Sequence, residues 1–141
     1  MFYKISNFKF IDDSKSTNFD STRYALKMTS NSILILGGSL KKGDNFFLKD
    51  LKNKIIKIYL YGNNIDLLKK SLKKQKINFS YFSNLKNLLK FIFMEDFKKM
   101  LNKKKNYNIL FSPGAASFDQ FLNFEQRGKI FKKYVYKFFK R

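Results

Sequence analysis

The sequence predicts a single α/β domain, residues 1–141, whose core is a Rossmann-like, mostly parallel sheet flanked by helices. Short runs rich in β-branched and aromatic residues alternate about five times with longer segments of helical periodicity. This alternation is typical of parallel strands joined by right-handed helical crossovers. A length of 141 residues and a hydrophobic content of 44% are sufficient for one domain with its own core.

Five segments have the length and composition of strands, and most are bounded by Asn, Gly or Ser. They are residues 8–11, 32–36, 55–61, 78–82 and 107–111. Each is short and rich in branched or aromatic side chains, as buried strands are. Because parallel strands point the same way, we expect their carboxyl ends to form one edge of the sheet.

The segments between these strands repeat apolar residues at helical spacing. Helices are predicted over residues 20–28, 64–74, 85–101 and 124–139, with a shorter one at residues 46–51. In the third, Glu95 precedes Lys99 by four residues, a spacing that supports an ion pair on the helix surface. In the last, Phe131, Val135 and Phe138 are expected to face the core.

The charge of the chain is strongly positive, with 30 Lys and Arg against 10 Asp and Glu and a formal net charge of +20. Such a charge is typical of proteins that bind nucleic acid, anionic membranes or negatively charged substrates. Here the excess is nearly all lysine, spread along the chain, with arginine only at positions 23, 127 and 141. A nucleic-acid footprint is concentrated on one face and rich in arginine. Solvated lysine faces are therefore the main interpretation, and nucleic-acid binding is the alternative.

Residue types that the chain lacks exclude several kinds of chemistry. It has neither Cys nor His, so a disulfide framework, a thiolate nucleophile and an imidazole base are ruled out. The longest apolar runs are far shorter than the roughly 20 residues needed to cross a bilayer. The amino terminus also lacks the apolar segment of a secretory signal. We expect a soluble cytoplasmic protein that uses carboxylates, lysines, hydroxyls and backbone groups.

Ligands of parallel α/β sheets bind in the loops between the carboxyl end of a strand and the next helix. Those loops are predicted at residues 12–20, 37–45, 62–64 and 112–117. The first begins with DDSKSTN, which places Lys15 among small hydroxyl residues at the start of a helix and suits phosphate or carboxylate binding. The same residue types are ordinary helix caps, so this loop alone leaves both interpretations open.

The second loop contains GGSLKKG over residues 37–43. Tandem glycines allow a tight turn or a close approach to a ligand, and Lys41 and Lys42 supply positive charge. A Walker A motif requires GxxxxGK[ST]; two glycines have this spacing, but Asp44 and Asn45 stand where Lys and Ser or Thr are required. The GxGxxG pattern is also absent, so the loop is not a standard nucleotide cradle.

The third loop reads SPGAAS over residues 112–117 and follows the last predicted strand. Pro113 is expected to end the strand, and the small residues after it allow a close approach. Ser117 is expected to begin a helix, with Gln120 at the spacing of a capping box. The free N–H groups of a first helical turn and the Ser117 hydroxyl suit an anionic group. A capped helix without a ligand explains the same pattern.

In this order, the three loops resemble the carboxy-terminal domain of the Mur ligase family, in its D-glutamate-adding branch. The resemblance rests on FIDDSKSTNFDSTRYAL (residues 10–26), ILILGGSLKKGDNF (residues 33–46) and ILFSPGAASFDQFLNFEQRGKIF (residues 109–131). It implies a Rossmann-like domain of an ATP-dependent amide ligase of peptidoglycan synthesis. In such enzymes ATP phosphorylates the carboxylate of UDP-MurNAc-L-alanine, and the amine of D-glutamate then attacks the acyl phosphate.

The resemblance also implies roles for residues of the first two loops. Lys15 and Thr17 match residues that line the nucleotide phosphates and the amino-acid carboxylate. Asp13 matches an aspartate near the nucleotide ribose. One lysine of the second loop matches a D-glutamate ligand: the spacing from the double glycine favours Lys41, whereas the following KGDNF favours Lys42.

In and after the third loop, Ser117 and Phe124 match residues whose hydroxyl and backbone N–H bind a glutamate carboxylate. Phe118 matches an adjoining backbone contact. No catalytic residue and no metal ligand of the family has a counterpart in this chain. The resemblance implies that ATP and Mg²⁺ are held mainly by a central domain that is missing here.

A complete ligase of this type also needs a UDP-binding domain and a central ATPase domain with its own phosphate loop. We therefore expect this chain to be inactive by itself and to be one part of a split enzyme, or a truncated one, that acts on UDP-MurNAc-L-alanine through a partner chain. The first alternative is a basic nucleic-acid-binding domain that has lost ligase activity. The second is a degenerate remnant, against which the intact spacing of all three loops argues.

Overall fold

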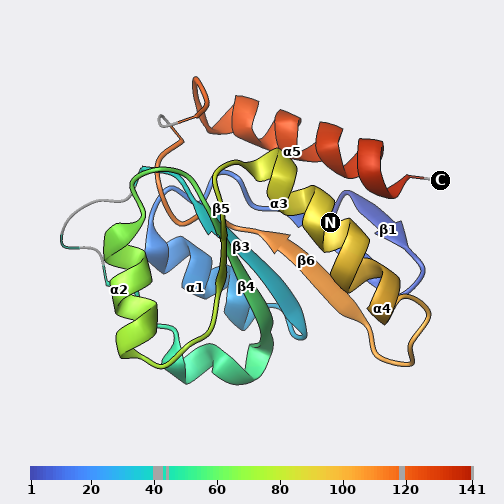
Figure 1. The fold of residues 1–141 in the computed structure, drawn as a ribbon, viewed down its shortest axis with the longest axis horizontal. Coiled ribbons are helices and arrows are strands. Elements are labelled where there is room, and N and C mark those ends of the chain that lie inside the picture. The colour runs from blue at the N-terminus through green and yellow to red at the C-terminus, as the bar shows by residue number, and fades with distance from the viewer. Residues whose placement is uncertain (40–42, 44, 118–119, 141) are drawn as a thin grey trace.

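A mostly parallel sheet of six strands forms the centre of the computed structural model, which describes residues 1–39, 43, 45–117 and 120–140. The strands are β1 (Tyr3–Ile5), β2 (Phe8–Asp12), β3 (Ser32–Gly37), β4 (Ile55–Tyr61), β5 (Ser80–Phe82) and β6 (Tyr107–Phe111). Their order across the sheet is β1-β2-β6-β3-β4-β5 (Figure 1). β1 is antiparallel to β2, and the other described pairs are parallel. This architecture confirms the predicted Rossmann-like α/β fold.

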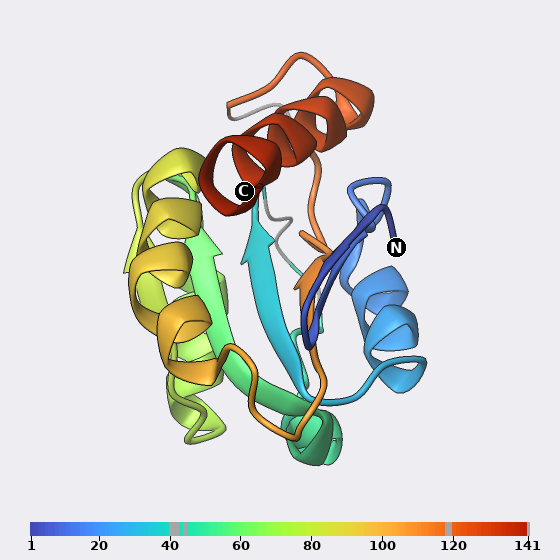
Figure 2. The same cartoon turned by 90° about the vertical axis from the view of Figure 1, so that its right-hand side faces the viewer.

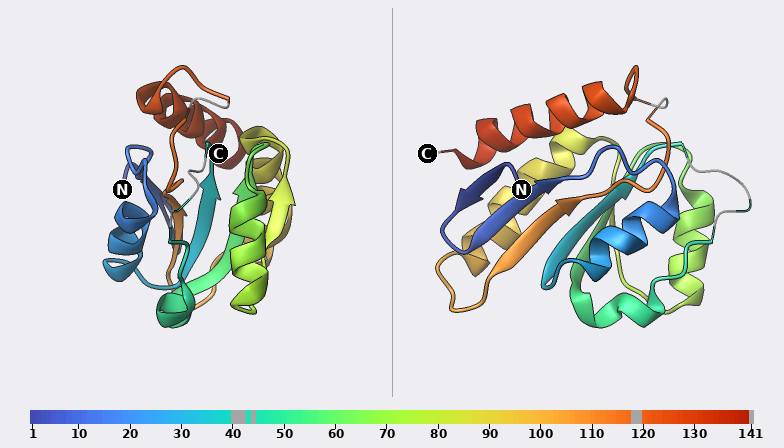
Figure 3. Two further views of the ribbon diagram at one scale, coloured as in Figure 1. Left: turned by 90° about the vertical axis from the view of Figure 1, so that its left-hand side faces the viewer. Right: turned by 180° about the vertical axis from the view of Figure 1, so that it is seen from behind.

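Helices cover both faces of the sheet. They are α1 (Phe19–Lys27), the 3₁₀ helix η1 (Lys49–Lys54), α2 (Asp66–Lys74), α3 (Leu85–Ile92), the π-helical turn η2 (Phe93–Phe97), α4 (Lys98–Met100) and α5 (Phe124–Phe139). α1, η1 and α2 pack on one face, which the right-hand view of Figure 3 shows from the front. α3, α4 and α5 pack on the other face, so that the sheet lies between two helical layers (Figure 2). In the described part of the chain, no helix combines the length and the apolar character that a membrane span requires.

Two hydrophobic clusters fill the space between the sheet and these layers. β3 contributes to both, because successive side chains of a strand point to opposite faces. Ile33 and Ile35 belong to the cluster under α3 and α5, and Leu34 and Leu36 to the cluster under α1 and α2. All four are fully buried, which explains why this strand is a continuous apolar run.

The third of the predicted long helices is confirmed as one continuous run of α3, η2 and α4 with a π-helical turn at its middle. The predicted pair of Glu95 and Lys99 forms on its surface, with 3.1 Å between Oε2 and Nζ. Asp96, in the π-helical turn, is only 2% exposed and contacts the Lys57 ammonium and the Tyr59 hydroxyl on β4. Burial, and then the hydrogen bond to this carboxylate, raise the pKa of Tyr59.

Two strands at the edges of the sheet differ from the prediction. The strand predicted over residues 78–82 is shortened to the three residues of β5, and β1 is a strand that the local pattern does not indicate. β1 pairs with β2, and its Tyr3 ring lies 5.7 Å from the ring of Phe10 and 5.4 Å from that of Tyr136. Pairing with the neighbouring strand and a ring contact from the far end of the chain together stabilise this short edge strand.

Two details of the helices also differ. The short helix predicted over residues 46–51 is wrong in its start, because η1 begins only at Lys49. Gln75 holds the preceding chain out of the helix, since its Oε1 accepts hydrogen bonds from the N–H groups of Leu48 and Lys49 at 2.8 and 3.1 Å. In α5, Phe139 is buried and the predicted Phe138 only partly so.

The helix predicted to begin at Ser117 is wrong. α5 begins at Phe124, and Asn123 caps it by accepting a hydrogen bond from the N–H of Gln126 at 2.8 Å. Gln120, the expected partner of Ser117 in a capping box, donates its side-chain N–H to the carbonyl of Ser83. The sequence offers two segments with capping spacing, and the chain uses the second.

Candidate functional site

Three loops meet at the edge of the sheet where the parallel strands end. Loop 1 (residues 12–18) follows β2, loop 2 (residues 37–45) follows β3, and loop 3 (residues 112–117) follows β6. In Figures 1 and 3, loops 1 and 3 lie beneath the amino-terminal end of α5. The N–H of Gly114 donates to the carbonyl of Ser16 at 3.1 Å, and the N–H of Ser39 donates to that of Ala116 at 2.7 Å. The structure therefore brings together the loops that the sequence singled out.

Side chains along loop 1 alternate between the interior and the surface. Ser14 and Ser16 are buried, at 8% and 3% exposure, whereas Lys15 and Thr17 are exposed. The N–H of Ser14 also donates to Oδ1 of Asp12 at 3.0 Å, which fixes the start of the loop. Lys15 and Thr17, both predicted ligands, are thus exposed to a ligand.

Asp13, predicted to lie near a nucleotide ribose, is partly buried between loops 1 and 3. Its carboxylate accepts hydrogen bonds from the hydroxyls of Ser16 and Ser112, the latter at 2.8 Å. The Ser112 hydroxyl also lies 3.0 Å from the hydroxyl of Thr22, which donates to the Ser112 carbonyl at 2.9 Å. This network joins loop 1, loop 3 and α1, so Asp13 has a structural role whatever it binds.

Loop 2 passes close to loop 3. The N–H of Gly37 donates to the carbonyl of Pro113 at 3.2 Å. Gly38 has a φ of +123°, where L side chains are rarely found, and a Cβ there would lie 2.4 Å from the carbonyl oxygen of Ala116. Only a glycine allows this approach without displacing loop 3. The predicted ligands Lys41 and Lys42, and Phe118 after loop 3, lie outside the described residues.

Loop 3 ends at Ser117, which is 3% exposed. Its carbonyl accepts a hydrogen bond from the N–H of Phe121 at 3.0 Å. Phe124 is the first residue of α5, and its N–H belongs to the first-turn donors that a helix leaves without an internal partner. Ser117 and Phe124 therefore lie at the two ends of the segment that connects loop 3 to α5.

Arg127, on α5, is a functional candidate that the sequence reasoning missed. Its side chain is fully buried. Nη1 donates to the carbonyl of Ala115 in loop 3 at 2.8 Å, and Nη2 donates to the carbonyl of Ser14 in loop 1 at 2.6 Å. A signal was present, because Arg127 precedes Phe131 and Val135 at intervals of four and falls on the buried face of the helix. A charged residue at such a position indicates specific polar partners.

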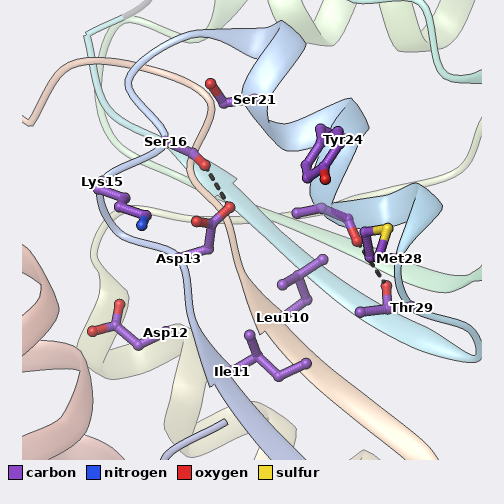
Figure 4. Close-up of a pocket in the computed structure, with 11 residues that line it drawn as sticks. Ile11, Asp12, Asp13, Lys15, Ser16, Ser21, Tyr24, Met28, Thr29 and Leu110 are labelled. Atoms are coloured by element: carbon purple, nitrogen blue, oxygen red, sulfur yellow. Dashed lines mark hydrogen bonds between the residues drawn. The ribbon is translucent and has the colours of Figure 1, made fainter.

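An open pocket of about 630 Å³ lies beside loop 1, between β2 and α1 (Figure 4). Asp13 and Lys15 form part of its polar side, and Ile11 and Leu110 part of its apolar side. The predicted site is only partly inside this pocket, because Ser117 does not line it. Among the residues that the structure describes, no three acidic side chains are placed together as metal ligands.

Comparison with known proteins finds several ligases of one name among the relatives of this chain. The UDP-N-acetylmuramoylalanine–D-glutamate ligase of Fusobacterium nucleatum subsp. nucleatum is 39% identical over 140 residues, which cover 99% of this chain and 32% of the relative. The ligase of the same name from Prochlorococcus marinus (strain MIT 9312) is 38% identical over 137 residues, covering 94% and 28%. That from Trichodesmium erythraeum is 39% identical over 127 residues, covering 88% and 26%. No family model matches the chain.

Over nearly its whole length, this chain is similar to these ligases. It spans between 26% and 32% of the length of these three relatives and corresponds to their carboxy-terminal domain. The resemblance drawn from the three loops is thereby confirmed, and these relatives give no support to the nucleic-acid alternative. The roles of individual site residues stay predictions.

Proposed function

We propose that this chain is the amino-acid-binding domain of an ATP-dependent ligase that joins D-glutamate to UDP-N-acetylmuramoyl-L-alanine in the cytoplasm, during peptidoglycan synthesis. The observation that carries the proposal is the 39% identity to a ligase of this name along 99% of the chain. The chemistry at the carboxyl-end edge of the sheet suits D-glutamate, because this amino acid carries two carboxylates. Lysine charge, hydroxyls and helix-start N–H groups are the donors that carboxylates accept best.

In this proposal the D-glutamate site is formed by loops 1 to 3 and the start of α5. Thr17 and Ser117 provide hydroxyl donors, and Phe124 provides a backbone N–H. One lysine of loop 2, Lys41 or Lys42, pairs with a carboxylate, and Phe118 adds a backbone contact. These groups orient the amine of D-glutamate toward the acyl phosphate that it attacks.

The nucleotide contacts in this proposal come from loop 1. The exposed Lys15 ammonium neutralises phosphate charge, and Thr17 lies where phosphate and amino acid meet. Asp13 accepts a hydrogen bond from the ribose through lone pairs that Ser16 and Ser112 leave available, since a carboxylate has about four acceptor positions.

The reaction needs a partner in this proposal. A separate chain, or further domains of a longer one, supplies the ATPase and UDP-binding parts, holds Mg²⁺ and most of ATP, and forms the acyl phosphate. The described residues of this chain offer no cluster of acidic ligands for the metal. Lys15, Thr17 and Asp13 then complete the nucleotide site from the opposite side when the parts meet.

The proposal is tested by mixing. The purified chain is combined with a candidate partner that carries the two other domains, and ADP release is followed with D-glutamate, with L-glutamate and without amino acid. We expect release that requires both proteins, UDP-MurNAc-L-alanine and the D enantiomer. If a fused single chain is active and the mixed pair is not, the truncated form is favoured. If neither releases ADP in response to D-glutamate, the proposed function is wrong.

Ser117→Ala tests the site itself. A hydrogen bond to a charged group contributes roughly 1.5 to 3 kcal/mol, so we expect the dissociation constant or KM for D-glutamate to rise by about 10- to 150-fold. Ser80→Ala, at an exposed position on β5, serves as the matched control and should leave both constants unchanged. If the dissociation constant and KM for D-glutamate are unchanged in Ser117→Ala, the Ser117 hydroxyl does not bind D-glutamate.

A further inference from the structure

We infer that Arg127 is a positioning residue that sets the geometry of the proposed D-glutamate site by joining loop 1, loop 3 and α5. The inference rests on the proposed function. It assigns a role to a residue that makes no contact with substrate in the proposal and that acts through the backbone of its neighbours.

The two carbonyls that Arg127 holds stand next to predicted ligands. Ser14, whose carbonyl accepts from Nη2 at 2.6 Å, immediately precedes Lys15. Ala115, whose carbonyl accepts from Nη1 at 2.8 Å, is two residues before Ser117. One guanidinium therefore fixes the spacing between the cation of loop 1 and the hydroxyl of loop 3.

The same side chain also fixes the start of α5 relative to the loops. Phe124 is three residues before Arg127, so the two residues lie within about one turn of the same rigid helix. Any shift of Arg127 moves the Phe124 N–H against Lys15 and Ser117. Three of the groups assigned to D-glutamate or phosphate thus depend on one clamp.

Two glycines show how tightly α5 and loop 2 pack beside this clamp. A Cβ on Gly128 would lie 2.4 Å from Oγ of Ser14, so α5 lies directly against loop 1. A Cβ on Gly38 would lie 3.1 Å from Nη1 of Arg127. There is room for the guanidinium and little more.

Arginine suits this place better than lysine. Its planar group presents several N–H donors in a fixed fork, so two carbonyls on different loops can be held at once, with the angle between them defined. A lysine ammonium keeps the charge but sits on a flexible stem and does not fix that angle. The exchange of Arg127 for Lys should therefore loosen the site while leaving a folded protein.

The test compares Arg127→Lys with Arg23→Lys in the full chain. Arg23 also uses a fork, to the carboxylate of Asp50 at 2.8 and 2.7 Å, and also donates to a carbonyl, that of Phe47. It connects α1 to η1 and takes no part in the proposed site. The measurements are the thermal midpoint, D-glutamate binding by titration, the KM values in the reconstituted pair, and amide hydrogen exchange.

For Arg127→Lys we expect at least a tenfold rise in the dissociation constant and KM for D-glutamate, with the KM for UDP-MurNAc-L-alanine changed less than twofold. Amide exchange should become at least tenfold faster in residues 14–17 and 115–117 and stay unchanged at the core amides of β3. Arg23→Lys should change neither KM by more than twofold. Arg127→Met, which removes the donors, should show the larger loss.

Other results overturn the inference. A D-glutamate constant within twofold of the wild type, or faster exchange in β3 to the same degree as in the loops, would make Arg127 an ordinary core residue. Failure of Arg127→Lys to fold would do the same. If the wild-type chain does not respond to D-glutamate at all, the proposed function is wrong, and exchange in the two loops alone decides whether the clamp exists.

Discussion

Replacing Gly38 by Ala tests how closely loop 2 is packed on loop 3. Two costs combine at this position. The φ of +123° disfavours any L side chain, and the new Cβ would lie 2.4 Å from the carbonyl oxygen of Ala116. Gly43, in the same loop, supplies the matched control, because it has a φ of +95° with nothing within 4 Å of a Cβ. The comparison separates backbone strain from collision.

The expected magnitudes follow from these two terms. A left-handed backbone costs an L residue about 1 to 2 kcal/mol, and the loss of unfolded-state freedom returns about 0.4 to 1 kcal/mol. Gly43→Ala should therefore lower the free energy of unfolding by roughly 0 to 1.5 kcal/mol. Overpacking adds about 1 to 3 kcal/mol, so Gly38→Ala should lower it by roughly 1 to 4.5 kcal/mol.

Urea unfolding followed by circular dichroism measures both variants, and D-glutamate binding is measured beside it. We expect Gly38→Ala to be the less stable by about 1 to 3 kcal/mol, the collision term, and to bind D-glutamate more weakly, because the displaced Ala116 carries Ser117 with it. Equal destabilisation of the two variants would refute the reasoning. It would mean that loop 3 can move away from the new Cβ without loss of stability, and that its packing does not fix the position of loop 2.

Three further predictions concern polar contacts away from the site. Asp96→Ala should lower the free energy of unfolding by roughly 3 to 5 kcal/mol, because it leaves the partners of a buried carboxylate unpaired. Urea unfolding measures this loss beside that of Lys57→Met. The Lys57 side chain is 48% exposed, so its replacement should cost less. The pKa of Tyr59 is raised by burial and by Asp96. The stability that the neutral Tyr59 side chain contributes is therefore fully present below the unfolded pKa of about 10, and it is lost as pH rises above that value. In the native state, absorbance at 295 nm between pH 10 and 11 should then match that of Tyr59→Phe, and a larger native signal in the wild type would contradict the prediction. The hydrogen bond from Arg23 lowers the pKa of Asp50, so this pair stabilises the fold above the unfolded pKa of about 3.9 and ceases to do so as pH falls below it. The stability difference between the wild type and Arg23→Ala should narrow below about pH 4 in acid titrations, and a constant difference would exclude the ion pair as its source.

The central strands and long helices could be predicted because their signals are local. A strand buried on both faces is a continuous apolar run, as in residues 32–37, and the apolar stripe of α5 repeats every four residues. β1 could not be predicted, because its three residues depend on pairing with β2 and on the Tyr136 ring from the far end of the chain. Short edge strands carry too few side chains for a local pattern.

The start of α5 shows a different limit. Ser117 with Gln120 and Asn123 with Gln126 both have the three-residue spacing of a capping box, and nothing in the local sequence separates them. A tertiary contact distinguishes them, since Gln120 donates to the carbonyl of Ser83 across the molecule. A choice between two equivalent local signals is made by packing.

The sequence predicts which loops form the candidate site, but not the hydrogen bonds that join these loops. The positions of the loops follow from strand order alone, because parallel strands end at one edge. The bonds that hold them together do not, since most run between backbone groups, which the identity of a side chain does not reveal. Asp13, Ser112, Thr22 and Arg127 are the exceptions, and of these Arg127 leaves a trace in the sequence, as a charge on a buried stripe.

The separation of framework from exposed side chains has a consequence for how substitutions should act. Loops 1 and 3 are joined through the carbonyls of Ser14, Ser16 and Ala115, which remain whatever side chain follows them. Lys15 and Thr17 project from this frame without belonging to it. Their replacement should therefore change ligand binding with little effect on the free energy of unfolding, whereas changes at Gly38 or Arg127 should alter both.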